Sequence, residues 1–289
     1  MEQLLPETPS RDGPILTRAG LSPTATVEAV DEYGNAHTVA VAGERPLTLY
    51  LDRREIVTLM TLGTRPEALA LGYLRNQGLI RDLAAIKAVQ VDWDVDAAAV
   101  TTFRGDAGES AQLERRTVTT GCGQGTVFGD LLADLERLQL PQRRYPQSLI
   151  YRLLKTLSTY NDIYRQAGAV HGCALCCDDR VLDFVEDVGR HNAVDAIAGQ
   201  MWLNGDLEGA DKSFYTTGRL TSEMVIKVAQ MGIPLLLSRS GITHMGLAIA
   251  RQVGVTLIGR AKGRHFLVFN GFDNIDFDAI PPPAPMQKK

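Results

Sequence analysis

The sequence predicts an α/β protein in which a smaller, mixed β-rich N-terminal domain precedes a larger α/β domain. Two observations support this prediction. In the first third of the chain, short segments alternate apolar and polar residues, which is typical of half-buried strands. After about residue 147, strand-like and helix-like segments follow one another in turn. That order favours a largely parallel sheet covered by helices.

The composition is that of a globular protein. With 289 residues, of which 45% are hydrophobic and 22% charged, the chain can bury a substantial core. A net charge of -4 disfavours broad binding to nucleic acid or to an anionic membrane, so we expect neither partner. We find no signal peptide and no apolar run long enough to span a bilayer, and we therefore expect a cytoplasmic protein.

The N-terminal part is expected to combine a flexible arm with a small mixed domain. Residues 1–20 contain three prolines and show no sustained period, which predicts the arm. Residues 21–118 are expected to form the domain. Within it, 46–62 alternates apolar and polar residues around a central polar turn, which predicts a hairpin. Further extended segments are predicted at 89–95, 100–104 and 114–119.

A helix is predicted directly after that hairpin. Thr64 and Glu67 have the spacing of a capping box, in which each side chain bonds to a backbone amide of the other residue. Apolar residues then recur at helical spacing until Gly78, where we expect the helix to end.

The larger domain is expected to follow a connecting region. Residues 119–146 hold a glycine-rich cysteine loop, a predicted helix at 127–138 and a linker at 141–146. Residues 147–272 are expected to form the α/β domain, and 273–289 a tail. The predicted helices of this domain are 149–157, 193–203, 221–231 and 243–253, and the predicted strands are 169–177, 181–185, 213–217, 234–238 and 255–259.

Polar segments follow the strands of this domain, at 186–192, 217–219, 238–241 and 260–265. Ligands of open α/β sheets usually bind beyond the carboxyl ends of the strands. Arginine offers paired donors to phosphate, so the set predicts a phosphate-bearing ligand, although any single segment could be an ordinary turn with solvated arginines. The predicted phosphate contacts are Arg190, Arg219, Lys262 and Arg264, and the predicted orienting or proton-handling groups are His171, Asp187 and His191.

Cys122 is the candidate nucleophile. It lies in the run Thr-Thr-Gly-Cys-Gly-Gln-Gly at 119–125, ahead of a predicted helix whose N-terminus would favour the thiolate. A thiolate can accept sulfane sulfur as a persulfide and pass it on. The alternative is a small apolar residue at a turn.

The cluster of His171, Cys173, Cys176 and Cys177 invites a zinc interpretation. On a strand, however, Cys176 faces away from the other three, so four-ligand closure would require the strand to break. We therefore favour buried thiols and expect no metal, while His171 fits either a site near 187–191 or a satisfied core histidine.

The order of the motifs resembles that of the formate dehydrogenase accessory sulfurtransferase family. The resemblance extends from about Ala25 to Phe269. The motifs are Leu-Gly-Tyr-Leu at 71–74, Gly-Leu-Ile at 78–80, the cysteine loop, Glu-Asp-Val-Gly-Arg-His-Asn-Ala-Val-Asp at 186–195, Gly218-Arg219 with Ser222, Glu223 and Lys227, Gly-Ile-Pro at 232–234, Ser240 with Thr243, and 259–264.

The resemblance implies a cytidine-deaminase-like domain at 147–272 and a persulfide on Cys122. It implies sulfur transfer from a cysteine desulfurase to the bis-molybdopterin guanine dinucleotide form of the molybdenum cofactor, before the cofactor enters apo formate dehydrogenase. It also makes a homodimer plausible. The cofactor-binding set that we expect is Arg260, Ala261, Lys262, Gly263, Arg264 and His265, together with Arg219, Arg190 and His191.

Three positions depart from the family pattern. Gly125 occupies the place of a second loop cysteine, so Cys122 can carry a persulfide but cannot form a disulfide within the loop. Ile242 replaces the usual proline before Thr243, and Arg260 stands where an aromatic residue is common.

Two other functions remain as alternatives. A non-catalytic chaperone for the cofactor would use the same pocket without transferring sulfur. A zinc deaminase needs a His-x-Glu motif and a Pro-Cys-x-x-Cys motif. None of the five histidines is followed by glutamate at the second position, and no proline precedes the cysteines, which disfavours the deaminase.

Overall fold

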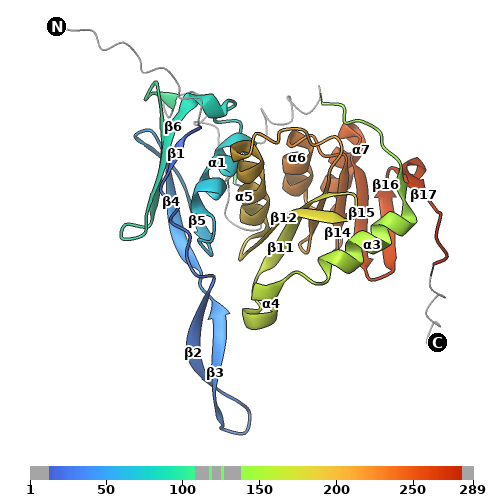
Figure 1. Cartoon of the computed structure of the whole chain (residues 1–289), viewed down its shortest axis with the longest axis horizontal. Coiled ribbons are helices and arrows are strands. Elements are labelled where there is room, and N and C mark those ends of the chain that lie inside the picture. The colour runs from blue at the N-terminus through green and yellow to red at the C-terminus, as the bar shows by residue number, and fades with distance from the viewer. Residues whose placement is uncertain (1–12, 108–116, 119–124, 127–137, 282–289) are drawn as a thin grey trace. The chain divides into compact units, whose positions relative to one another are not determined.

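The computed structural model describes residues 13–107, 117–118, 125–126 and 138–281. Cys122 lies outside the described residues, as do all but the last residue of the predicted helix at 127–138, most of the predicted strand at 114–119 and the ends of the chain. The chain forms an α/β protein of two compact units (Figure 1). The first unit comprises 1–134, 162–172 and 185–207, and the second comprises 135–161, 173–184 and 208–289. Each unit is thus assembled from separate segments, whereas the domain ranges expected from the sequence are contiguous.

The first unit is built on a five-stranded sheet in the order β1-β6-β7-β4-β5. The predicted hairpin is present as β4 and β5, which are antiparallel. The other strand neighbours include a parallel pair, β4 with β7, so the sheet is mixed. Its strands are β1 Ile15–Leu16, β4 Arg45–Leu51, β5 Arg54–Thr61, β6 Ile86–Asp92 and β7 Ala97–Thr102, and a 3-10 turn spans Leu83–Ala85.

A separate hairpin, β2 and β3, also belongs to the first unit (Figure 1). The sequence prediction missed it. Most residues of both strands are exposed, so they lack the one-sided apolar alternation by which half-buried strands are recognised. The hairpin consists of β2 Thr24–Val30 and β3 Ala36–Ala42, and the short helix α4, Asp162–Ala167, contacts β3.

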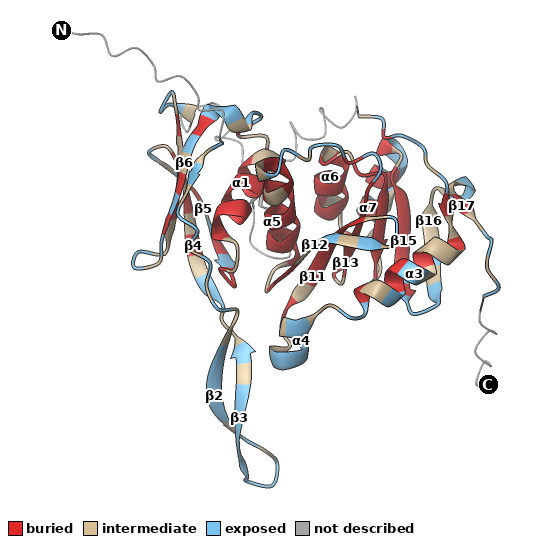
Figure 2. Ribbon diagram, viewed as in Figure 1, coloured by how far each residue is buried: buried red, intermediate tan, exposed pale blue. Residues whose placement is uncertain are grey.

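The helices α1, Pro66–Asn76, and α5, Arg190–Leu203, pack closely together, and both are buried over most of their length (Figure 2). Glycine permits this approach. A Cβ atom at Gly72 would lie 1.7 Å from the carbonyl oxygen of Asp195, and one at Gly199 would lie 1.9 Å from that of Ala68. The Asn76 amide also donates to the Asp195 carboxylate at 2.7 Å.

The predicted helix at α1 is confirmed, but the predicted capping box is wrong. Arg65 is the N-cap residue and makes no side-chain cap, while Pro66 begins the helix. The Glu67 carboxylate instead accepts a hydrogen bond from the amide of Ala19 at 2.7 Å. The Glu67 carboxylate therefore bonds to the amide of Ala19, which is distant in sequence, and not to the amide of Thr64 as predicted.

The second unit contains most of a six-stranded sheet in the order β12-β11-β13-β14-β15-β16. Three strands, β13, β14 and β15, are parallel to one another, whereas β11 and β16 flank them in antiparallel orientation. The sheet is therefore mixed, and the expectation of a largely parallel sheet is wrong. The strands are β11 His171–Cys177, β12 Arg180–Asp187, β13 Ser213–Thr216, β14 Leu235–Ser238, β15 Thr256–Lys262 and β16 His265–Asn270.

The predicted amphipathic helix before the sheet is present as α3, Gln147–Leu157. Its apolar residues form a core cluster with side chains from β11, β13, β14 and β15. The helices α6, Ser222–Gln230, and α7, His244–Val253, pack together, and α7 also contacts β15 and β16. The remaining short elements are the paired strands β8 Thr117–Val118 and β9 Gly125–Thr126, the paired strands β10 Tyr145–Pro146 and β17 Ile275–Asp276, and a 3-10 turn at Phe272–Asn274.

No helix among the described residues has the length and hydropathy that a membrane crossing requires.

The contact between α1 and α5 yields a test of stability. We expect Gly199→Ala to lower the free energy of unfolding by about 1–3 kcal/mol, because the new methyl group meets backbone that cannot move aside alone. Urea denaturation measures this change. Gly241→Ala is the control, since a Cβ atom there meets nothing within 4 Å. Equal losses in the two variants would contradict the close approach of the helices.

Candidate functional site

The carboxyl ends of β13, β14 and β15 meet at one edge of the sheet, since these strands are parallel. The last residues of β13 and β14, Thr216 and Ser238, are register partners, and both are fully buried. The sequence predicted that the segments 217–219 and 238–241 each follow a strand, and the structure shows that these two strands are neighbours. This edge is the described part of the candidate site.

Buried hydroxyl groups hold the two loops at this edge. The Ser238 hydroxyl donates to the carbonyl oxygen of Gly218 at 2.6 Å and accepts from the amide of Ser240 at 2.9 Å. The Thr216 hydroxyl accepts from the amide of Gly218 at 3.1 Å. An isolated bridge between Leu220 and Ile242 continues the contact. These polar groups are satisfied within the protein, so they position the backbone.

Arginine side chains emerge from this fixed backbone. Arg219 and Arg239 are exposed, and so is Arg260 on β15. The amide of Arg260 donates to the carbonyl oxygen of Ser240 at 2.8 Å, which joins β15 to the loop after β14. Exposed guanidinium groups on a rigid frame can donate paired hydrogen bonds to phosphate oxygens without a large loss of backbone entropy.

The segment 260–265 differs from the expected loop. β15 continues to Lys262 and β16 begins at His265, with Lys262 and His265 paired in register, so the segment is a β-hairpin. Ala261 is buried in the core cluster, whereas Arg260 and Lys262 on either side of it are exposed. Gly263 adopts a φ of 61° at the turn. Ala261 therefore anchors the strand, and its side chain cannot contact a ligand in solvent.

Asp187 is the centre of a buried hydrogen-bond network in the first unit. One carboxylate oxygen accepts from the Thr61 hydroxyl at 2.6 Å and from the Leu62 amide at 3.1 Å. The other accepts from the Gly189 amide at 3.1 Å and from the Asn192 side chain at 2.8 Å. Burial raises the pKa of Asp187, and the four hydrogen bonds oppose part of that rise. The network joins the end of β5 to the turn before α5.

Arg190 and His191, which the sequence marked as ligand contacts, are buried with exposed fractions of 6% and 3%. They begin α5, whose N-cap residue is Gly189. Glu186, just upstream, accepts from the backbone amides of Ile163 and Tyr164 at 3.0 and 2.9 Å, and so holds the start of α4. Much of the polar density in this motif therefore serves packing, which its spacing did not reveal.

Two of the three described cysteines are poorly suited to nucleophilic chemistry. Cys173 and Cys176 are fully buried on β11. Burial raises the pKa of Cys176 to about 12, so it is a neutral thiol at physiological pH. Cys177 is partly exposed and lies 3.8 Å from the Asp211 carboxylate. His171 is half-buried at the start of β11, and its expected proximity to 187–191 stays a prediction.

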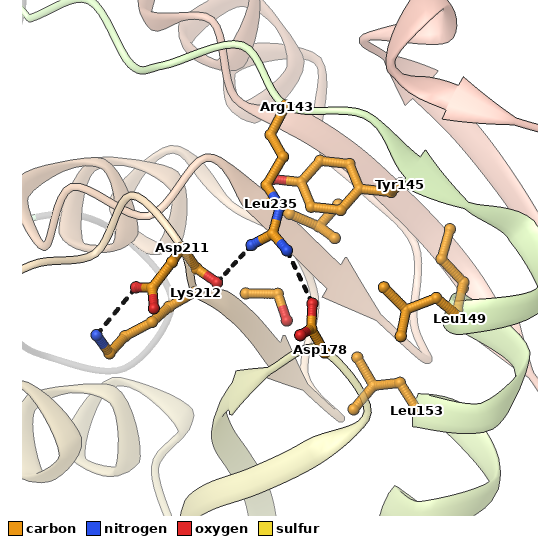
Figure 3. A pocket seen from close by; sticks show the side chains of 10 residues that line it. Arg143, Tyr145, Leu149, Leu153, Asp178, Asp211, Lys212 and Leu235 are labelled. Carbon is orange, nitrogen blue, oxygen red and sulfur yellow. Dashed lines mark hydrogen bonds and ion pairs between the residues drawn. The ribbon is translucent and has the colours of Figure 1, made fainter.

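The described residues offer no cluster of three or more histidine, cysteine or acidic side chains placed to hold a metal ion. A small enclosed cavity beside Arg143 has a volume of about 10 Å³, which is room for about one water molecule (Figure 3). Arg143 donates to the Asp178 carboxylate at 2.8 Å and to the carbonyl oxygen of Asp211 at 2.6 Å across this cavity. We interpret these hydrogen bonds of Arg143 as structural contacts.

The Asp187 network yields a second test. Asp187→Asn replaces one acceptor oxygen with an amide donor that faces existing donors, so we expect a loss of about 1–3 kcal/mol in the free energy of unfolding. Asp106→Asn, at an exposed position, is the matched control. A neutral effect of Asp187→Asn in urea denaturation would show that the network is dispensable.

The buried thiols yield a third test. In the native protein at about pH 8, we expect iodoacetamide to label Cys173 and Cys176 far more slowly than in urea, because the reagent needs an accessible thiolate. Peptide mass spectrometry measures both rates. Equal labelling of Cys176 in the two conditions would contradict its burial.

Comparisons with known proteins agree on one family. A family model described as the FdhD/NarQ family matches residues 42–276. The sulfur carrier protein FdhD of Listeria monocytogenes serotype 4b (strain F2365) is 29% identical over 239 residues, covering 82% of this chain and 91% of the relative. The protein of the same name from Bacillus subtilis (strain 168) is 28% identical, covering 78% and 86%.

A solved structure is also similar. A crystal structure from Desulfotalea psychrophila, described as a formate dehydrogenase accessory protein, matches with a TM-score of 0.70 and 28% identity, covering 88% of this chain and 98% of that one. Because the family model matches well over half of the sequence, the chain belongs to the FdhD/NarQ family.

Proposed function

We propose that this protein is a sulfur carrier that receives persulfide sulfur from a cysteine desulfurase and transfers it to the bis-molybdopterin guanine dinucleotide cofactor, for use by formate dehydrogenase. The observation that carries the proposal is the family match across 42–276, which spans the Gly-Cys-Gly sequence around Cys122. The names of the relatives, sulfur carrier protein and formate dehydrogenase accessory protein, support the same conclusion.

Cys122 is the proposed carrier, and the protein acts as a sulfurtransferase through it. The Cys122 thiolate attacks the terminal sulfur of the desulfurase persulfide. A new S–S bond forms on Cys122, the donor S–S bond breaks, and the donor cysteine leaves as a thiolate. This loading step needs no oxidant, because the sulfane sulfur changes partners without a net redox change.

Two of the three described cysteines are unsuited to carry sulfur, which supports the choice of Cys122. Cys173 and Cys176 are fully buried, and a thiol with a pKa of about 12 supplies little thiolate. Cys122 lies outside the described residues, in the connection between the paired strands β8 and β9. Gly125 begins β9, so this loop has no second thiol and the carried sulfur cannot be lost to a disulfide within it.

The cofactor is the bound substrate of the proposed reaction, and basic side chains contact its phosphates. The exposed cations fit such a group: Arg219 lies at the strand edge, and Lys262 and Arg264 lie at the β15–β16 hairpin. Arg190 and His191 are buried, so support of the first turn of α5 suits them better than a phosphate contact. Desulfurase, apo formate dehydrogenase and a second copy of the chain are the proposed partners, in the cytoplasm.

A second candidate function follows from Gly125. If the missing second thiol has removed transfer activity, the protein would be a non-catalytic chaperone that only binds the cofactor. The two functions differ in what the loss of Cys122 does. A chaperone would still activate formate dehydrogenase without this thiol, whereas a carrier would not.

Sulfur loading is the direct test of the proposal. After incubation with a desulfurase and cysteine, we expect the intact mass to rise by one sulfur atom in the wild type and in Cys177→Ala, but not in Cys122→Ala. Cys177→Ala is the matched control, because it removes a partly exposed described thiol. Activation of apo formate dehydrogenase should be lost only in Cys122→Ala. A persulfide that persists in Cys122→Ala would defeat the assignment.

A further inference from the structure

A cavity of about 470 Å³ lies in the second unit between α3 and the turn of the β15–β16 hairpin. Its volume is within the range of small-molecule sites. The helix contributes residues three or four positions apart, which places them on one face of α3 and its C-terminal end. The lining residues are Ser148, Tyr151, Arg152, Leu154, Lys155, Ser158, Gly263, Arg264 and Ala279.

The lining of this cavity is cationic. It contains three basic side chains, Arg152, Lys155 and Arg264, and no acidic side chain, although the whole chain has a net charge of -4. Arg152 binds the Asp179 carboxylate through Nε at 3.0 Å and also interacts electrostatically with Asp278, so Lys155 and Arg264 supply most of the net positive charge of the lining. Lys155 is exposed and forms no ion pair with any other described residue. The cavity therefore favours an anionic occupant.

Arg264 is held in position before any ligand arrives. Its Nη2 donates to the carbonyl oxygen of Ile280 at 2.8 Å, and its guanidinium carbon lies 5.0 Å from the ring centroid of Tyr151. A guanidinium group has five N–H donors, so these contacts leave donors for an anion. A donor fixed by stacking loses less side-chain entropy on binding than a free one does.

We propose that this cavity binds the phosphate groups of a phosphate compound through Lys155 and Arg264, with Arg152 and Ser158 at its border. The inference deepens the proposed function and rests on it only for the ligand's identity, because Gly263 and Arg264 belong to the segment assigned to the cofactor. The new element is α3, because it supplies Lys155 as a binding residue outside the segment 260–265. The phosphates can come from the guanine nucleotide end of the cofactor or from a free phosphate compound.

Calorimetric titration of the full chain with GDP, inorganic pyrophosphate and guanosine tests this site. We expect pyrophosphate to bind and guanosine not to bind. Lys155→Ala and Arg264→Ala should each weaken binding about tenfold, the effect of losing one charge-assisted hydrogen bond. Lys155→Arg should retain binding, because it keeps the charge. GDP that binds at least as tightly as pyrophosphate assigns the site to a nucleotide, and GDP that fails to bind assigns it to free phosphates.

Matched controls separate this site from general electrostatics. Lys87→Ala and Arg251→Ala remove one exposed positive charge each from residues that do not line the cavity, and should leave binding unchanged. Equal weakening by these controls, absence of pyrophosphate binding, or guanosine binding as strong as that of GDP would each overturn the inference. Persulfide loading of Cys122 is measured on the same variants, so that a failed cavity and a failed sulfur carrier give different results.

Discussion

The hydrogen bond from the Ser238 hydroxyl to the carbonyl oxygen of Gly218 fixes the geometry on which the candidate site depends. It joins the loops that follow β13 and β14, and the Ser240 amide closes the same turn on that hydroxyl. Because the hydroxyl is buried, replacing it would leave a carbonyl oxygen without its partner. The exposed guanidinium groups of Arg219 and Arg239 therefore project from a backbone that needs no ligand to order it.

Local periodicity was sufficient to predict a helix or strand that has one buried face. The apolar stripe of α3 and the alternation of β4 and β5 were readable in the sequence, and both elements are present. Periodicity did not predict contacts that depend on a residue distant in sequence. Glu67 bonds to the amide of Ala19, 48 residues away, and the two glycines between α1 and α5 meet backbone from the other helix. Spacing along one element carries no information about such partners.

In the candidate site, too, the sequence predicted some features and did not reveal others. The sequence identified 260–265 as a basic, exposed segment after a strand. Because most of its residues are basic, we did not predict that the strand continues into it, to Lys262. Ala261 is the signal that was available: one small apolar residue between two cations has the period of a strand with one face buried. In 186–192, the spacing did not reveal that Asp187 and Glu186 form hydrogen bonds within the protein, or that Arg190 and His191 are buried.

Electrostatics explains why the proposed function would need exposed cations. A persulfide and a phosphate-bearing cofactor are both anionic at neutral pH, and two unit charges about 4 Å apart repel by about 1 kcal/mol in water and by more where water is excluded. A chain with a net charge of -4 adds to that repulsion. Exposed Arg219, Lys262 and Lys155 offset it locally, since opposite charges near the surface raise the local concentration of an anion and speed its association. Under the proposed function, the local position of these cations therefore matters more to an approaching anion than the charge of the whole protein does.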